Sequence, residues 1–322
     1  MIQVNRVAFK IAGVCFGLVL RLRISPVCGT LRRMLRAHLL AHITRDQIVT
    51  KRLLRLVVVI AVFGAALSIA YRGLHQGIFT MALSADRLDL SKYVLTFSDE
   101  FDYLSVSADR PGTRWTAHTP YGGDFGDAQF TDPTPTFPFT VQNGVLRIEA
   151  RKDADGKWKS GLLSSWTPQG LGFSQKFGYF EIRAKLPEGA GVWPAFWLLG
   201  IDRSDRFPEI DVLEYYGHAP HRFHSVVHIW KGGKSEEGRE QITQVPPHSL
   251  ENDFNTFGVE VTAEWTTFYL NGTQIWRTKS EPEFSQPLYV LLNLALGSGW
   301  PIDKVPNPSF MYVDYVRVYA LR

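Results

Sequence analysis

The chain has 322 residues, 45% of them hydrophobic and 20% charged, a composition that argues against disorder, a collagen helix and a coiled coil. Residues 1–80 hold 12 Lys/Arg against one acid, a net charge of +11, whereas the other 242 residues hold 23 bases and 30 acids, a net charge of −7. Because phosphate neutralisation needs clustered Lys and Arg, this balance argues against nucleic-acid binding by the larger part.

The first element in chain order is an apolar stretch, residues 53–70, interrupted only by Arg55. Eighteen residues are just enough to cross a bilayer as a helix. Basic residues before it are expected to hold that end in the cytoplasm, so the chain after Ala70 is expected outside. The stretch is either an uncleaved anchor or a signal peptide that ends at Ala70, and translation starts at Met1 or at Met34.

The predicted organisation has four parts. They are a basic cytoplasmic tail (1–52), a transmembrane signal-anchor or signal peptide (53–70), a linker (71–92) and one large domain (93–322). A domain of this size suits one all-β unit better than two ordinary domains. We expect it to be monomeric and exported to the periplasmic or extracellular side, either membrane-anchored or secreted.

Short strands and turns are predicted throughout the large domain. Residues 180–186, FEIRAKL, alternate apolar and charged side chains, which indicates a strand with one wet face. The dipeptide 271–272, Asn-Gly, separates two strand-like segments and predicts a type I′ hairpin. Residues 288–296 read as a buried strand and 312–321 as a terminal strand. Such a pattern indicates a sandwich or barrel, and the two-faced strands favour a sandwich.

Three carboxylates fall within six residues in the segment FPEIDVLEYYG: Glu209, Asp211 and Glu214. On a flat strand the first two share a face, but the third points to the opposite side. A β-bulge at Val212 and Leu213 would bring all three to one face. Close carboxylates repel, so at least one pKa is expected to rise.

A carboxylate pair on one wet face suits glycoside hydrolysis, in which one group attacks the anomeric carbon and the other transfers protons. A Ca²⁺ site and a solvated strand face are the alternatives. Trp193 and Trp197 are four apart and share a strand face, and His228 falls roughly opposite Asp211 if the following strand pairs with this one. Because apolar sugar faces stack on aromatic rings, these neighbours favour a saccharide cleft.

In these residues and the segments around them, the sequence resembles the glycoside hydrolase family 16 enzymes, the group of laminarinases, lichenases, agarases and carrageenases. The resemblance runs through LTFSDEFD (95–102), SGLLSS (160–165), KFGYFEIRAKLPEGAGVWPAFWLL (176–199), EIDVLE (209–214) and VDYVRVY (313–319). It implies an all-β, concanavalin-like jelly-roll sandwich of two curved antiparallel sheets, with substrate lying across the concave sheet.

The resemblance also implies roles for individual residues. Glu209 matches the family nucleophile, Asp211 the residue that tunes it, and Glu214 the acid/base. The residues expected to bind substrate are Trp193, Trp197, His228, Asn293 and Trp300. No cofactor is required for this chemistry.

Three finer expectations follow from the resemblance. Some relatives bind a structural Ca²⁺, and Glu100 and Asp314 match its acidic ligands by position. The two-residue spacing between Asp211 and Glu214 is similar to the laminarinase and agarase side of the family, which favours a β-1,3-linked glucan or a bacterial exopolysaccharide. The long irregular loop Ala117–Phe139 is expected to line a subsite.

The leading hypothesis is therefore an endo-acting, retaining β-glycosidase that acts by double displacement. Its partners would be a polysaccharide substrate and, if residues 53–70 remain uncleaved, a membrane. Two alternatives stay open: a transglycosylase that shares the covalent intermediate, and a non-catalytic, lectin-like sandwich that binds polysaccharide.

Overall fold

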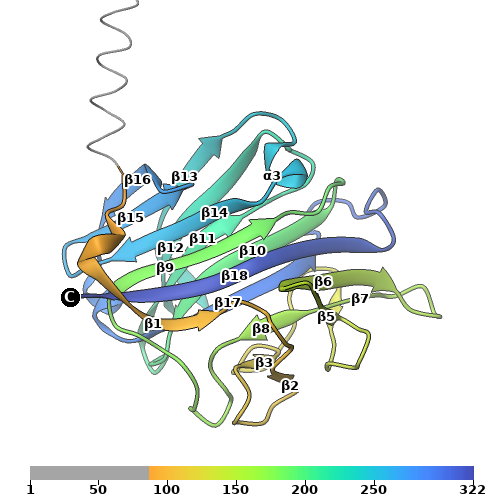
Figure 1. The fold of residues 1–322 in the computed structure, drawn as a ribbon, viewed down its shortest axis with the longest axis horizontal. Coiled ribbons are helices and arrows are strands. Elements are labelled where there is room, and N and C mark those ends of the chain that lie inside the picture. Colours follow the sequence, from red (N-terminus) through yellow and green to blue (C-terminus); the bar gives the residue numbers. More distant parts are fainter. Residues whose placement is uncertain (1–86) are drawn as a thin grey trace, which may run out of the picture. The chain divides into compact units, whose positions relative to one another are not determined.

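The structure, a computed structural model, describes residues 87–322, which form two β-sheets packed face to face (Figure 1). The predicted tail, the predicted span at 53–70 and most of the predicted linker lie outside the described residues. Within residues 87–322, no helix has the length and apolar character needed to cross a membrane.

The first sheet has ten strands. Its order is β16 (Thr273–Lys279), β15 (Trp265–Leu270), β14 (Asn255–Val261), β9 (Gly178–Lys185), β18 (Ser309–Leu321), β6 (Val145–Lys152), β7 (Trp158–Ser160) and β4 (Gln129–Phe130), with β1 (Tyr93–Asp99) beside β18 and β5 (Phe139–Gln142) beside β6.

The second sheet has eight strands. Its order is β13 (Lys234–Gln244), β12 (Arg222–Lys231), β11 (Arg206–Glu214), β10 (Val192–Gly200), β17 (Leu288–Leu296), β8 (Leu162–Ser164), β3 (Trp115–Ala117) and β2 (Val106–Ser107). The helical elements of the described chain are short: η1 (Leu90–Lys92), α3 (Ser249–Asn252) and η2 (Pro282–Ser285).

The predicted jelly-roll sandwich is confirmed. Strand pairs are antiparallel except for two short parallel pairs, β2 with β3 and β4 with β7. The Asn-Gly hairpin joins β15 to β16, with Asn271 at φ 51° and Gly272 at φ 73°, the positive values that a type I′ turn needs. The buried strand predicted at 288–296 is β17, and all nine of its residues are buried.

The core lies between the sheets and takes alternate side chains from both. On β10, Phe196 and Leu198 point into this core, whereas Trp197 and Leu199 point to the other face of the second sheet. Each fully buried large apolar side chain contributes roughly 1.5–3 kcal/mol. The second sheet therefore has two apolar faces. The outer face carries the aromatic residues that form the site described below, and several of them are only partly buried.

The described chain begins with residues that contact the β15–β16 hairpin. Leu88 donates its backbone N–H to the carbonyl of Gly272 at 3.1 Å, and Arg87 forms a bridge with Thr273. The last residues of the predicted linker thus pair with the first sheet before β1 begins at Tyr93.

Candidate active site

The three carboxylates lie on β11, where the register shifts. Asp211 faces Val226 on β12, and Glu214 faces His224, so three steps on β11 match two on β12. The pairing with β10 shifts at the same place. The bulge expected from the sequence is confirmed, and it brings Glu209, Asp211 and Glu214 to one face.

This face is hollowed into a cleft of about 440 Å³. Besides the carboxylates, the cleft is lined by Tyr121, Phe125, Trp193, Ala195, Trp197, Tyr216, His228, Trp230, Asn293 and Ser298. The loop 117–139 contributes two of these aromatic residues, as expected. A concave site with large apolar walls and a few convergent polar groups is typical of ligand pockets.

Aromatic rings surround the carboxylates. The Phe125 ring meets Trp193 edge-on, with centroids 5.4 Å apart, and Trp197 at 6.0 Å. Trp193 is in turn stacked with Tyr216, with 18° between the ring planes. The two tryptophans that were expected to share a face do so, and they supply surfaces on which sugar rings can stack.

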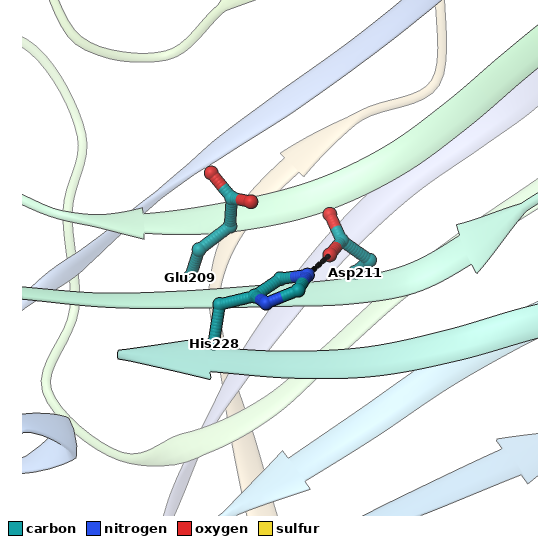
Figure 2. A group of neighbouring side chains, drawn as sticks. All are labelled: Glu209, Asp211 and His228. Carbon is teal, nitrogen blue, oxygen red and sulfur yellow. Dashed lines mark ion pairs between the residues drawn. The ribbon is translucent and has the colours of Figure 1, made fainter. Parts of the chain in front are cut away.

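His228 lies beside two of the acids (Figure 2). Its direct cross-strand neighbour is Glu209, one pairing step from the expected Asp211. The side chain nevertheless reaches Asp211, with Nε2 at 3.6 Å from Oδ2, while Nδ1 lies 3.0 Å from the Ser235 hydroxyl. Burial lowers the pKa of His228, which favours the neutral ring.

Glu209, Asp211 and His228 form one cluster of potential metal ligands. Their ligand atoms lie within 4.8 Å of one another, and no other cluster of three such side chains occurs among residues 87–322. The cluster contains two of the three expected catalytic acids, Glu209 and Asp211, and retaining glycoside hydrolysis by two carboxylates requires no metal.

Glu214 is held by two donors. The Trp193 indole N–H donates to Glu214 Oε1 at 3.0 Å, and the Tyr216 hydroxyl donates to the same oxygen at 3.2 Å. Both contacts leave Oε2 free of these donors. The carboxyl group is therefore fixed in direction, with one oxygen available to a ligand in the cleft.

Burial raises the pKa of all three acids. For Glu209 the pKa rises to about 7, with the Glu214 charge adding to the effect and the Trp230 indole opposing it, although that indole N–H makes no hydrogen bond of good geometry. Asp211, only 6% exposed, has its pKa raised well above the usual range by burial and then by the other two carboxylates. The pKa of Glu214 also rises through burial. The expected shift occurs, but removal from water is its main cause and repulsion is secondary.

Asn293 and Trp300, the other two residues expected to bind substrate, differ in their position relative to the cleft. Asn293 lies on β17 in the cleft wall, fully buried, and its Oδ1 accepts a 2.9 Å hydrogen bond from the Trp197 indole. Its Nδ2 is buried without a partner in the structure. Trp300 does not line the cleft; it is 47% exposed and packs on His218 at 3.9 Å between centroids. His218 in turn contacts the cleft residue Tyr216, so Trp300 is connected to the cleft wall through these two rings.

Glu100 and Asp314 are each paired with an arginine. Arg317 makes two hydrogen bonds to Glu100, at 2.8 and 2.9 Å, and Arg183 contacts Asp314 at 2.5 Å. Calcium prefers six to eight oxygen ligands, and a guanidinium supplies none. As placed, these two side chains do not fit a calcium ion, and calcium binding stays an untested prediction.

Some cleft residues were not singled out from the sequence. Tyr121 and Phe125 belong to a loop that was flagged without naming its side chains, because spacing alone does not tell which loop residues turn inward. Tyr216 follows the carboxylate motif beyond the end of β11. The strand alternation places Trp230 on the same side as His228, although Trp230 was not among the residues expected to bind substrate.

A model of the glycosyl hydrolases family 16 matches residues 130–317, more than half of the chain. The chain belongs to this family. Among curated family 16 relatives, it is 35% identical to the endo-1,3-1,4-beta-glycanase ExsH of Rhizobium meliloti over 74% of this chain and 54% of that protein. It is 31% identical to the beta-glucanase of Rhodothermus marinus over 74% of this chain and 89% of that protein. The chain thus spans about half the length of ExsH.

Solved structures of family 16 enzymes share the fold. The laminarinase catalytic domain from Thermotoga maritima superposes with a TM-score of 0.60 at 27% identity, covering 72% of this chain and 99% of that one. SCLam, a non-specific endo-beta-1,3(4)-glucanase, gives 0.62 at 28% identity, covering 74% and 94%. The expected family resemblance is confirmed by both kinds of comparison.

Proposed function

We propose that this chain is an endo-acting β-glucan hydrolase that retains the configuration at the anomeric carbon. The observation that carries the proposal is the bulge, because it presents Glu209, Asp211 and Glu214 together in an aromatic cleft. The chain's family membership and the β-glucanase names of its relatives support the same reaction.

In the first step, a carboxylate oxygen of Glu209 attacks the anomeric carbon. The glycosidic C–O bond breaks, and Glu214 gives its proton to the leaving oxygen. In the second step, Glu214 takes a proton from water, and the water oxygen attacks the anomeric carbon and releases Glu209. One water is consumed for each bond cleaved, and its proton replaces the one that Glu214 gave to the leaving oxygen. Glu214 must begin the cycle protonated, in keeping with its raised pKa.

Asp211 lies between these two groups in sequence and on the same face. Its raised pKa favours the protonated form, and a proton on Asp211 reduces the negative charge around the nucleophile. We propose that it tunes Glu209. His228, 3.6 Å from Asp211, would act through it as a positioning residue.

For the substrate, we propose a β-1,3-linked or mixed β-1,3/1,4-linked glucan, or a bacterial exopolysaccharide with such a backbone. The cleft is lined by aromatic rings and three acids and by no Lys or Arg among the described residues, which suits a neutral chain. The relatives' names point to the same linkages.

The test uses the full chain and the variants Glu209→Gln and Glu214→Gln on laminarin, mixed-linkage glucan and agarose. Product length shows endo action, and NMR of the first-formed anomer shows retention. We expect both variants to lose at least about a thousandfold in kcat. Inverted product would overturn the retaining mechanism. Binding without any release of reducing ends by the wild type would favour the lectin-like alternative, and longer products would favour transglycosylation.

A further inference from the structure

A second hollow lies on the other side of the molecule, on the outer face of the first sheet. It has a volume of about 620 Å³ and is formed by β5, β6, β9 and β18, with Phe254 just before β14. On β18, Met311 and Val313 point into the core, so Tyr312 between them points outward into this groove. The hydrophobic core separates the groove from the cleft.

Two cations lie on the strands beside Tyr312, and the guanidinium of one of them, Arg147, lies 4.9 Å from the centre of the Phe310 ring. Arg147 on β6 and Lys185 on β9 are both direct cross-strand neighbours of Tyr312, one on each side. The Lys185 ammonium lies 5.0 Å from the centre of the Tyr312 ring. Within residues 87–322, Lys185 makes no ion pair, so its charge remains available to a ligand.

The groove has a net positive charge. None of the described residues that line it is Asp or Glu. The carboxylate that pairs with Arg147, Glu149, is buried and also pairs with Arg151, at 3.3 Å and 3.2 Å, so two arginines share one acid. The active-site cleft has the opposite character, because its charged lining consists of three carboxylates.

The groove also offers groups that recognise sugars. Tyr312 and Phe254 supply aromatic surface, and the exposed amides of Gln142 and Asn143 supply hydrogen-bond donors and acceptors at its end. Aromatic surface in a groove that also holds an Arg and a Lys suits a sugar that carries a carboxylate, since the ring stacks while the carboxylate pairs with Arg or Lys.

We propose that this groove is a second carbohydrate site that binds an acidic, carboxylate-bearing polysaccharide, separate from the cleft that acts on the β-glucan. The site would hold the enzyme on an acidic matrix while the cleft works on a neutral chain. Residues 1–80, with a charge of +11, have the wrong sign to occupy it.

The experiment measures binding of the full chain to polygalacturonate, an acidic polysaccharide, and to laminarin, a neutral one. Arg147→Gln/Lys185→Gln should weaken polygalacturonate binding by about tenfold or more, and added salt should weaken it in the wild type. Tyr312→Ala should weaken it as well. The control, Arg277→Gln/Lys279→Gln, removes the same charge from β16 of the same sheet and should change binding less than about twofold. Hydrolysis of laminarin by the groove variants should stay within about twofold of wild type and checks that each is folded.

Equal weakening by the control pair would overturn the proposal in favour of diffuse charge, and so would unchanged binding in Tyr312→Ala. Should Arg147→Gln/Lys185→Gln fail to fold, Lys185→Gln alone and Tyr312→Ala decide the question. Binding to phosphatidylglycerol vesicles that is lost in the groove variants, without binding to polygalacturonate, would assign the groove to membranes instead. Because binding is read without catalysis, a chain that binds polygalacturonate but hydrolyses nothing would overturn only the proposed function.

Discussion

Val212 and Leu213 are consecutive residues on one strand, yet both point into the core between the sheets. In a regular strand, neighbours point to opposite faces. The two can share a face only because the register with β10 and β12 shifts here. The carboxylate before this pair and the carboxylate after it therefore reach the same cleft.

Deleting Val212 removes the extra residue and should turn Glu214 toward the core. We expect kcat to fall by at least about a thousandfold, as for loss of the acid/base, and the protein to be less stable because a carboxylate is buried without a partner. Val212→Ala keeps the residue count and is the control: it should cost about 1–3 kcal/mol of unfolding free energy and retain activity. Reducing-end assays and urea unfolding measure the two effects. Equal activity in both variants would contradict the importance of the bulge.

The raised pKa of Glu209 predicts how stability depends on pH. The folded protein keeps this proton up to about pH 7, whereas the unfolded chain loses it near pH 4.5. The folded state thus binds more protons in this window, so the unfolding free energy falls as pH rises from about 4.5 to 7. Glu209→Gln cannot ionise and should be more stable than wild type by about 1–3 kcal/mol at pH 8, and nearly equal at pH 4.

Urea unfolding at pH 4, 6 and 8 measures this difference. Glu264→Gln, which removes an exposed carboxylate, is the matched control and should show no such pH dependence. A constant difference between Glu209→Gln and wild type across the three pH values would contradict the shift.

His228 should affect the reaction through Asp211. His228→Ala removes the ring beside Asp211 Oδ2, and we expect kcat/KM to fall by roughly tenfold, with a shifted acid limb of the pH–rate profile. Ser235→Ala removes the partner of Nδ1, together with a hydrogen bond to the Glu237 carbonyl, but keeps the ring, and it should have a smaller effect. A lower rate with an unchanged pH profile would mean that the ring is needed for packing alone.

Arg203 should set substrate affinity from the cleft edge. Its guanidinium lies 3.7 Å from the centre of the Tyr121 ring and 4.6 Å from that of Phe207, which holds Tyr121 in the cleft wall. Arg203→Gln should raise KM by about three- to tenfold with little change in kcat. Arg277→Gln loses a similar contact with Trp265, outside the cleft, and is the control. A fall in kcat alone would mean that Arg203 acts through its charge on Glu209.

Much of the fold and the centre of the site could be predicted from local pattern. The period of two in residues 180–186 identified β9, and the Asn-Gly pair identified the β15–β16 turn, because both depend on the conformations of a few neighbouring residues. The spacing of Glu209, Asp211 and Glu214 required a bulge for a common face. That conclusion needs only the geometry of a strand.

What the tertiary structure decided concerns residues that are far apart in the chain. Asn293 and Trp197 are 96 residues apart, and they meet because β17 pairs with β10. The pKa of Glu209 depends on how much water the surrounding walls exclude, which no spacing reveals. The groove beside Tyr312 likewise exists only because β6 and β9 lie on either side of β18. Strand periodicity is a local property of the sequence, whereas burial, charge pairing and cavity shape depend on which strands become neighbours.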